Sequence, residues 1–245
     1  MTLTEIRQKA EEMPLEKAVS WLADIIPSYG ISVAKLADTY SKRLIRLKEE
    51  RKRLLQMSEF EIQARSKGFV HIGGIDEAGR GPLAGPVVAG CVILPEDCFI
   101  EHLNDSKKLT PSLRDKLFDL IKKEAVDFGI GMIMPEEIDE INILNATKKA
   151  MIQAVSCLKT KPDYLIIDAL ELPLPITQLS VYKGDSLSVS VAAASIIAKV
   201  TRDRWMEEAH KLYPEYGFDR HKGYGTQEHM EAIKKFGLCP IHRKS

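Results

Sequence analysis

The pattern of apolar and polar positions along the chain changes near Gly68. Beyond this point, apolar and β-branched runs bounded by Gly, Pro and Asp predict strands at 69–76, 86–95, 127–135, 163–170 and 176–185. Apolar residues at helical spacing predict helices at 135–158, 190–213 and 226–236. Strands that first follow one another and then alternate with helices indicate a mixed α/β sheet flanked by helices.

The segment before Gly68 has no strand pattern and predicts helices instead. A short helix at 4–13 precedes a second one at 14–26, whose first turn suits Pro14. The composition at 27–30 is that of a turn. A longer helix follows, with an apolar stripe formed by Leu36, Tyr40, Leu44, Leu47 and Leu54.

We therefore expect a small N-terminal helical accessory domain at 1–68 and an α/β domain at 69–245. The longest predicted helix is basic, because Ser41–Arg53 holds seven basic residues against two acidic ones. Residues 1–70 contain 13 basic and 10 acidic residues, a net charge of +3, which leaves −3 for the rest of a neutral chain. A solvated basic face is the more common meaning of such a run, and a substrate-binding face is the alternative.

Overall composition narrows the function less than local pattern does. Lys+Arg and Asp+Glu balance at 35 each, so any nucleic-acid binding must come from clustered charge. No stretch approaches the roughly 18 consecutive apolar residues of a membrane span, and the N-terminus mixes acids and bases, unlike a signal peptide. The four cysteines form no CxxC pair or metal-ligand spacing. We expect reduced, mostly buried thiols in a cytoplasmic protein.

Acidic residues stand at the ends of three predicted strands. Asp76 and Glu77 end the first strand, Asp168 ends the fourth and Asp185 ends the fifth. The functional crevice of an α/β sheet lies at strand ends, so these side chains are candidates to converge. One such acid alone more often caps a helix or forms an ion pair. Four together would repel one another and raise their pKa values unless cations neutralise them.

Hard oxygen ligands of this kind suit Mg²⁺ or Mn²⁺ rather than zinc. Two such ions, roughly 3.5–4 Å apart, can stabilise both the attacking and the leaving oxygen in phosphodiester hydrolysis. Neighbours on a regular strand point to opposite faces, so Asp76 and Glu77 can share a site only if the strand ends or bulges between them. Nearby glycines would permit such a break, and they are Gly73, Gly74 and Gly79.

Several sequence blocks, taken together, resemble the ribonuclease HII family. They are GIDEAGRGPLAGPVVAG at 74–90, DSKKLT at 105–110, LIIDAL at 165–170, KGDSLSVSVAAASIIAKVTRDR at 183–204, HKGYGT at 221–226 and the terminal PIHRKS. The resemblance implies a ribonuclease H-like fold, Mg²⁺ or Mn²⁺ as cofactor, and cleavage of RNA–DNA hybrids that leaves a 3′-hydroxyl and a 5′-phosphate. It also implies DNA duplexes containing ribonucleotides as substrates, and so a role in DNA replication and repair.

The resemblance assigns roles to individual residues. The acidic quartet of the family, which is catalytic and metal-binding, falls on Asp76, Glu77, Asp168 and Asp185. Substrate-binding positions fall on the Gly-Arg-Gly element, on a phosphate-contacting lysine and on a ribose-sensing tyrosine, that is, on Gly79, Arg80, Gly81, Lys107 and Tyr224. The resemblance implies no obligate protein partner and no membrane, and we expect a monomer. The chain ends at HRKS, where family members usually continue, which gives no basis for expecting a partner-binding tail such as a sliding-clamp motif.

Three further polar residues have more ordinary interpretations. Ser195 suits close packing of a helix rich in small residues, and His221 suits a surface loop. Asp203 can pair on the helix surface with Lys199, and a supporting role beside the metal site is the alternative.

Two other classes of function compete with the hybrid-cleaving endonuclease. A non-catalytic nucleic-acid-binding protein would use the basic helix, but four convergent carboxylates would then repel phosphate for no purpose. A DNA nuclease or recombinase of the same superfamily would keep the fold. The tyrosine and the Gly-Arg-Gly element argue against it, because sensing a ribose has no use on DNA.

Overall fold

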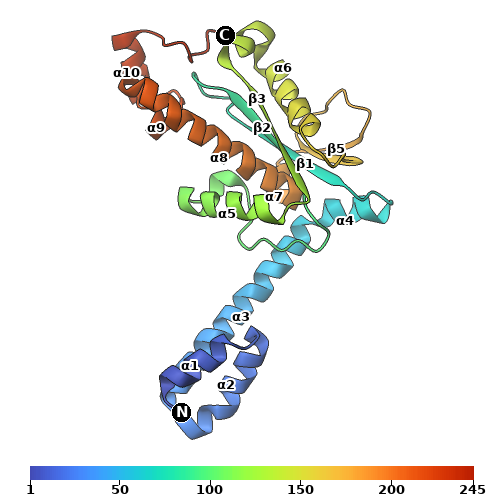
Figure 1. Ribbon diagram of the computed structural model, residues 1–245, viewed down its shortest axis with the longest axis vertical. Helices are drawn as coiled ribbons and strands as arrows, with labels where there is room; N and C mark the ends of the chain where they lie inside the picture. Colours follow the sequence, from blue (N-terminus) through green and yellow to red (C-terminus); the bar gives the residue numbers. More distant parts are fainter. The chain divides into compact units, whose positions relative to one another are not determined.

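The computed structural model describes all 245 residues, which form two compact units, Met1–Leu55 and Gln56–Ser245. In the first unit, α1 spans Leu3–Glu11 and α2 spans Leu15–Tyr29. Helix α3 begins in this unit and spans Ile31–Met57 (Figure 1). The three helices enclose a small apolar cluster built from Ile6, Ala10, Ala18, Leu22, Val33, Leu36, Ala37 and Tyr40.

The turn predicted at 27–30 is wrong in its position, because α2 continues through Pro27. Ile25 and Ile26 pack against the apolar cluster of this unit, and this packing offsets the backbone hydrogen bond that proline cannot donate. The helix ends at Gly30, whose φ of 71° leaves the helical region and whose N–H donates to the Ile26 carbonyl.

The basic run lies on α3, and three of its seven bases pair with acids of the same unit. Lys42 Nζ lies 2.7 Å from an Asp38 oxygen, and Lys48 Nζ lies 3.7 Å from a Glu16 oxygen. Arg53, near the end of the unit, pairs with Glu50 at 2.7 Å. This part of the helix surface is therefore partly neutralised by its own neighbours.

The second unit contains the mixed sheet that the sequence predicts. Its strand order is β3-β2-β1-β4-β5, in which β1 pairs antiparallel with β2 and parallel with β4. The strands are β1 Ile72–Ala78, β2 Val87–Ile93, β3 Asp127–Ile133, β4 Tyr164–Asp168 and β5 Thr177–Val181. The helical elements are α4 Glu59–Ser66, η1 Ser106–Lys108, α5 Pro111–Glu124, α6 Pro135–Ser156, α7 Gly184–Leu187, α8 Val189–Leu212, η2 Pro214–Tyr216, α9 Phe218–His221 and α10 Gln227–Phe236. No helix is both long enough and apolar enough to cross a bilayer.

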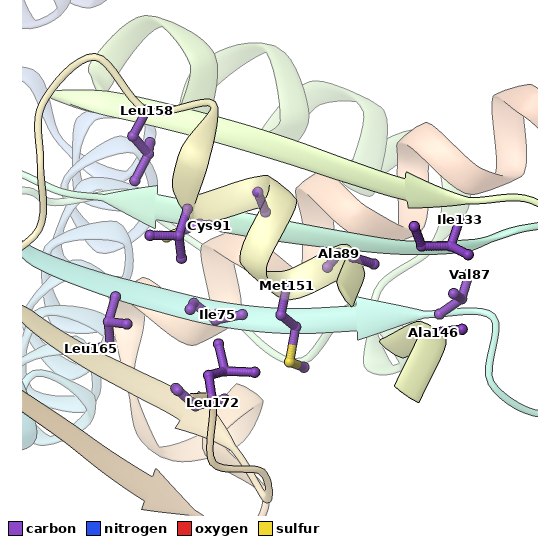
Figure 2. Packing of buried hydrophobic residues seen from close by; sticks show 14 of the residues in the cluster. Ile75, Val87, Ala89, Cys91, Ile133, Ala146, Met151, Leu158, Leu165 and Leu172 are labelled. Atoms are coloured by element: carbon purple, nitrogen blue, oxygen red, sulfur yellow. The ribbon is translucent and has the colours of Figure 1, made fainter. Parts of the chain in front are cut away.

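The sheet is covered by α6 on one face and by α8 on the other. Figure 2 shows Met151 of α6 against the strand residue Ile75, within a cluster that also holds Leu165. On the opposite face α8 approaches so closely that a Cβ added to Gly74 would lie 2.1 Å from the Ser190 backbone. The small residues at the start of α8 permit this approach, as the sequence predicts.

Helix α4 belongs to the second unit, so the observed boundary follows Leu55 instead of residue 68. Ala64 packs in an apolar cluster with the strand residues Ile72 and Ile166. Glu61 is buried, and its Oε1 accepts hydrogen bonds from Ser188 Oγ at 2.5 Å and from Ser190 N at 3.0 Å. This helix is thus anchored to the N-terminus of α8.

Candidate active site

The carboxylates meet at the ends of the two central parallel strands. Pairing between β1 and β4 stops at Ile75 and Ile167, so Asp76 and Asp168 are the next residue of each strand. Side chains alternate along a strand, which puts Asp76 on the Gly74 face, against α8. The register gives Asp168 the same face, so the two carboxylates come from adjacent strands and the same side of the sheet.

Glu77 reaches this region without the break in β1 that the sequence led us to expect. Pairing with β2 runs unbroken from Gly73 to Ala78, so the strand neither ends nor bulges between Asp76 and Glu77. The strand ends only after Ala78, one residue further on. The charge of Glu77 nevertheless raises the pKa of Asp76, and the charge of Asp168 raises the pKa of Glu77. The three carboxylates therefore lie close to one another around one strand end.

Asp185 lies on the short helix α7, which corrects the expectation that it ends the fifth strand. Strand β5 stops at Val181, and Lys183 adopts a left-handed conformation with a φ of 60° that turns the chain into α7. The Gly184 N–H donates to Asp168 Oδ1 at 2.8 Å, which ties α7 to the end of β4. The fourth acid therefore joins the same site from a helix.

Burial and mutual repulsion make the carboxyl groups of this site hard to ionise. Asp76 is 3% exposed, and burial, followed by the charge of Glu77, raises its pKa well above the usual range. Burial also raises the pKa of Glu77, and the charge of Asp168 adds to this. Burial and the charge of Asp105 raise the pKa of Asp185.

Two basic residues partly offset this charge. Arg80 Nη1 lies 3.4 Å from Glu77 Oε1, and Lys107 Nζ lies 3.7 Å from Asp185 Oδ2. Partial burial alone would lower the pKa of Lys107, but the surrounding carboxylates, with Asp76 first, raise it. Lys107 is thus a counter-ion of the site as well as a candidate phosphate contact.

Three residues of the site were not identified from the sequence. Ser195 hydrogen bonds to the Asp76 carboxylate and, through Oγ at 2.9 Å, to Ser106. Its interpretation as a packing residue alone is therefore wrong. Asp105 lies close enough to Asp185 for its charge to raise the pKa of that residue, and it accepts a hydrogen bond from Lys107 N at 2.9 Å. Asp105 and Ser106 both belong to the DSKKLT block. The resemblance of this block to the family is the one sequence signal that points to these two residues.

The two predicted substrate-sensing elements lie beside each other. A Cβ added to Gly81 would lie 3.8 Å from Tyr224 Cε1, so the Gly-Arg-Gly backbone runs next to the tyrosine ring. Tyr224 is 45% exposed and thus open to a ligand. Arg80 links this region to the carboxylates through its contact with Glu77.

Other polar residues lie outside this cluster. Asp203 pairs with Lys199 at 2.7 Å and with Arg114 at 4.0 Å, as expected for a helix-surface acid. His221 is buried, with Nε2 on the Tyr216 carbonyl at 2.7 Å, so its interpretation as a surface histidine is wrong. The thiols also differ from expectation, since only Cys91 of the four is buried.

The carboxylate cluster fits a bound cation by its chemistry. As the side chains stand, no group of three or more His, Cys, Asp or Glu has a geometry that could hold a metal ion. Glu77 Oε2, however, is buried and has no hydrogen-bond partner. A buried carboxylate oxygen without a partner costs free energy that a cation would recover. Asp76 and Asp185 supply further hard oxygen ligands of the type that Mg²⁺ and Mn²⁺ prefer.

Comparison with known proteins identifies the family. The sequence model of the family described as Ribonuclease HII matches residues 73–245. This chain belongs to the ribonuclease HII family. It is 56% identical to ribonuclease HII of Acetivibrio thermocellus over 246 residues, which cover 100% of this chain and 96% of that protein. It is 52% identical to the Clostridioides difficile ribonuclease HII over 245 residues, with the same coverage.

Solved structures extend the similarity to the ribonuclease HII fold. Ribonuclease H2 of Pyrococcus horikoshii matches with a TM-score of 0.60 and 33% identity, over 71% of this chain and 92% of that one. RNase HII of Archaeoglobus fulgidus, solved in complex with PCNA, matches with a TM-score of 0.60 and 27% identity, over 71% and 94%. Bst-RNase HIII in complex with Mn²⁺, at 20% identity and a TM-score of 0.55 over 71% of this chain and 65% of that one, shares the fold.

The predicted fold class is therefore confirmed, and so is the predicted enzyme class. The protein is a ribonuclease H-type hydrolase, and its family membership supports cleavage of the RNA strand of RNA–DNA hybrids.

Proposed function

We propose that this ribonuclease HII also cuts DNA duplexes on the 5′ side of a single embedded ribonucleotide. The observation that carries the proposal is the position of Gly81 beside the exposed Tyr224 ring, with Arg80 in contact with Glu77. A duplex that lies along this backbone presents its 2′-oxygen to the amides of 79–81, and that atom alone separates ribose from deoxyribose. The Tyr224 ring then packs on the adjacent deoxyribose, where a second 2′-hydroxyl would clash.

We propose that Asp76, Glu77, Asp168 and Asp185 hold two Mg²⁺ or Mn²⁺ ions. When bound, such ions stabilise the attacking and the leaving oxygen of an in-line displacement at phosphorus. The raised pKa values of Asp76 and Glu77 support this assignment, because both carboxyls gain from nearby positive charge. Hydrolysis at the 3′-oxygen of the upstream nucleotide leaves a 3′-hydroxyl and a 5′-phosphate.

The protein's own residues position the substrate around these ions. Lys107 is 76% exposed at its side chain, so its ammonium can turn from Asp185 to a substrate phosphate. Ser195 holds the Asp76 carboxylate in place from α8. Gly184 does the same for Asp168 through its backbone N–H. These supports keep the carboxylates oriented while the charges around them change.

The direct test is cleavage of a DNA duplex that holds one ribonucleotide, in Mg²⁺, in Mn²⁺ and in chelator. We expect one cut, 5′ of the ribonucleotide, with either metal and none in chelator. A long RNA–DNA hybrid serves as the positive control. Cleavage of the hybrid without cleavage of the single-ribonucleotide duplex would reject the junction function. Cleavage in chelator would reject the metal assignment.

We infer that the basic run of α3 adds phosphate contacts to hybrid binding. Its support is the seven-base run at Ser41–Arg53, in which Arg43 and Arg46 are exposed. Replacing Arg43 and Arg46 by Gln should weaken hybrid binding and make its salt dependence shallower, since each lost phosphate contact lowers the slope by about 0.9. Replacing Lys9 and Lys17 by Gln gives a control of equal charge. Unchanged affinity and slope would show the run to be a solvated face.

That the protein works as a monomer in the cytoplasm, without an obligate protein partner, stays a prediction.

A further inference from the structure

Arg202 of α8 is buried among backbone carbonyls instead of facing a carboxylate. The residue is 1% exposed. Its Nε donates to the Pro86 carbonyl at 2.9 Å and its Nη2 to the Ala84 carbonyl at 3.0 Å. Its Nη1 donates to the Lys222 carbonyl at 3.0 Å. One side chain thus joins the 79–86 loop, which carries the Gly-Arg-Gly element, to the loop that carries Tyr224.

Arg243, near the end of the chain, binds the other end of the same loop. Its Nη2 donates to the Gly79 carbonyl at 2.6 Å, its Nη1 to the Arg80 carbonyl at 3.1 Å and its Nε to the Gly85 carbonyl at 3.0 Å. Its backbone N–H also donates to the Leu83 carbonyl at 2.8 Å. All these acceptors lie within the 79–86 loop.

At the start of the 79–86 loop, the backbone carbonyls are hydrogen bonded and the backbone amides are not. The carbonyls of Gly79 and Arg80 are taken by Arg243, whereas the amides of Gly79, Arg80 and Gly81 donate no hydrogen bond. Unpaired amides are the groups that a phosphate or 2′-hydroxyl can accept from. The arginines therefore fix the loop through its carbonyls and leave its amides available to a ligand.

Gly79 is required by Arg202 itself. Its φ is 99°, a conformation that other residues rarely adopt, and a Cβ there would lie 2.2 Å from Arg202 Nε. The structure shows that the close approach at Gly79 is made by the guanidinium, and that Gly81 is the glycine next to Tyr224.

Burying the Arg202 guanidinium and half-burying that of Arg243 is costly, because a charge removed from water without an opposite charge loses its hydration. Burial lowers the pKa of Arg202, and it lowers the pKa of Arg243 to about 10. An apolar contact could close these loops at less cost. A rigid planar donor that bonds three carbonyls at once gives something an apolar contact cannot, a fixed distance and orientation between two loops.

We propose that Arg202 and Arg243, here called the arginine clamp, are positioning residues that set the Gly-Arg-Gly backbone relative to the Tyr224 ring and thereby determine cleavage at an RNA-to-DNA junction. Arg202 bridges the two loops, and Arg243 orders the first loop alone. The inference rests on the proposed junction function for its effect on cleavage. The placement of the loops can be measured separately.

Hydrogen–deuterium exchange of the full-length protein tests the placement. Arg202→Lys keeps the charge but cannot reach three carbonyls, so exchange should speed up at Leu83 and at Tyr224, one amide in each loop. Arg243→Lys should speed up exchange only at 79–86. Arg204→Lys, on the same helix but exposed and paired with Asp115 at 3.0 Å, is the matched control and should change neither. Unchanged exchange in both clamp variants, or an equal rise throughout the sheet, would overturn the proposal.

Cleavage by the same variants tests the specificity. The measured quantity is the ratio of kcat on a single-ribonucleotide duplex to kcat on a long RNA–DNA hybrid. Either clamp variant should lower this ratio by at least about tenfold, because small displacements of a positioning group are expensive at the reacting bond. Cuts should also spread to positions beside the junction. Equal losses on both substrates would reduce the clamp to a structural element. Wild-type protein that fails on the single-ribonucleotide duplex would refute the junction function itself, and the exchange result would still decide whether the clamp couples the loops.

Discussion

Two regions of the second unit bury charge in opposite ways. At the ends of β1 and β4, carboxylates of like charge are gathered, and Glu77 Oε2 has no hydrogen-bond partner. At the 79–86 loop, Arg202 is buried and Arg243 is half-buried, and each guanidinium makes at least three hydrogen bonds to carbonyls. In the first region the negative charges are only partly neutralised, and a bound cation would stabilise them. The second is complete in itself and serves geometry. Buried charge alone is therefore an ambiguous sign: it gathers like charges at the strand ends, whereas at the 79–86 loop it holds backbone carbonyls in place.

The largest expected effect concerns the carboxylates. Asp168→Asn keeps the shape of the side chain but removes a ligand charge, so cleavage of RNA–DNA hybrid should fall thousands-fold or more. Hybrid binding should change little, and the metal-free variant should be no less stable than the wild type. Asp203→Asn, a change of the same kind at an acid outside the site, is the control. Near-normal turnover of Asp168→Asn would remove this residue from the catalytic set.

The arginine region should respond in stability instead. Arg202→Ala leaves three buried carbonyls without donors, which should lower the free energy of unfolding by about 3–5 kcal/mol. Chemical denaturation of the metal-free protein measures this directly, and Arg204→Ala supplies the value for an exposed arginine of the same helix. A loss as small as that of Arg204→Ala would show that the buried guanidinium contributes no more than a surface one.

A smaller effect is expected where α4 meets α8. Glu61→Ala leaves Ser188 Oγ and the Ser190 amide without their acceptor, which should cost about 1–3 kcal/mol. Deletion of 1–68, which removes α4, should destabilise the second unit by more than deletion of 1–55. Equal stability of the two truncated proteins would show that α4 is dispensable to this unit.

Two buried histidines near Tyr224 predict a mild sensitivity to acid. His229 Nε2 and His242 Nε2 lie 3.0 Å apart, and burial lowers the pKa of both. The unfolded chain binds protons at these two histidines more readily than the folded one. Stability should therefore be full above pH 6.5 and fall as the pH drops below it, and the total loss should be about 1.4 kcal/mol for each unit by which a histidine pKa is lowered. The Tm at pH 7.5 and pH 5.5 measures this. His242→Asn should reduce the difference, and an unchanged difference would assign the acid sensitivity to other groups.

What the sequence could predict was local. The strands follow from short apolar runs, and Asp76, Glu77 and Asp168 stand out because they end such runs. In the structure the three acids lie together at the ends of the interior strands β1 and β4. Asp185 was assigned to the correct region but to the wrong element. The left-handed Lys183 that starts α7 has no distinctive signal, since lysine rarely adopts this conformation.

What the sequence could not predict depends on contacts between distant residues. Ser195 meets Ser106 across 89 positions, and Glu61 meets Ser188 across 127. Neither pair has a periodic pattern, and each residue alone has an ordinary interpretation. The arginine clamp is of the same kind, because Arg243 and its acceptor Gly79 are 164 positions apart.

Thermal unfolding tests most directly whether the strand-end carboxylates are gathered for cations at the expense of the fold. Wild-type protein and Asp76→Asn are compared across a Mn²⁺ titration that starts in chelator. In chelator the variant should melt higher, since it lacks a buried like charge, and each kcal/mol gained corresponds to about 2–4 °C. Added Mn²⁺ should raise the Tm of the wild type and leave the variant nearly unchanged. A variant that melts lower than wild type in chelator and responds equally to Mn²⁺ would contradict the account, because Asp76 would then stabilise the fold and bind no cation.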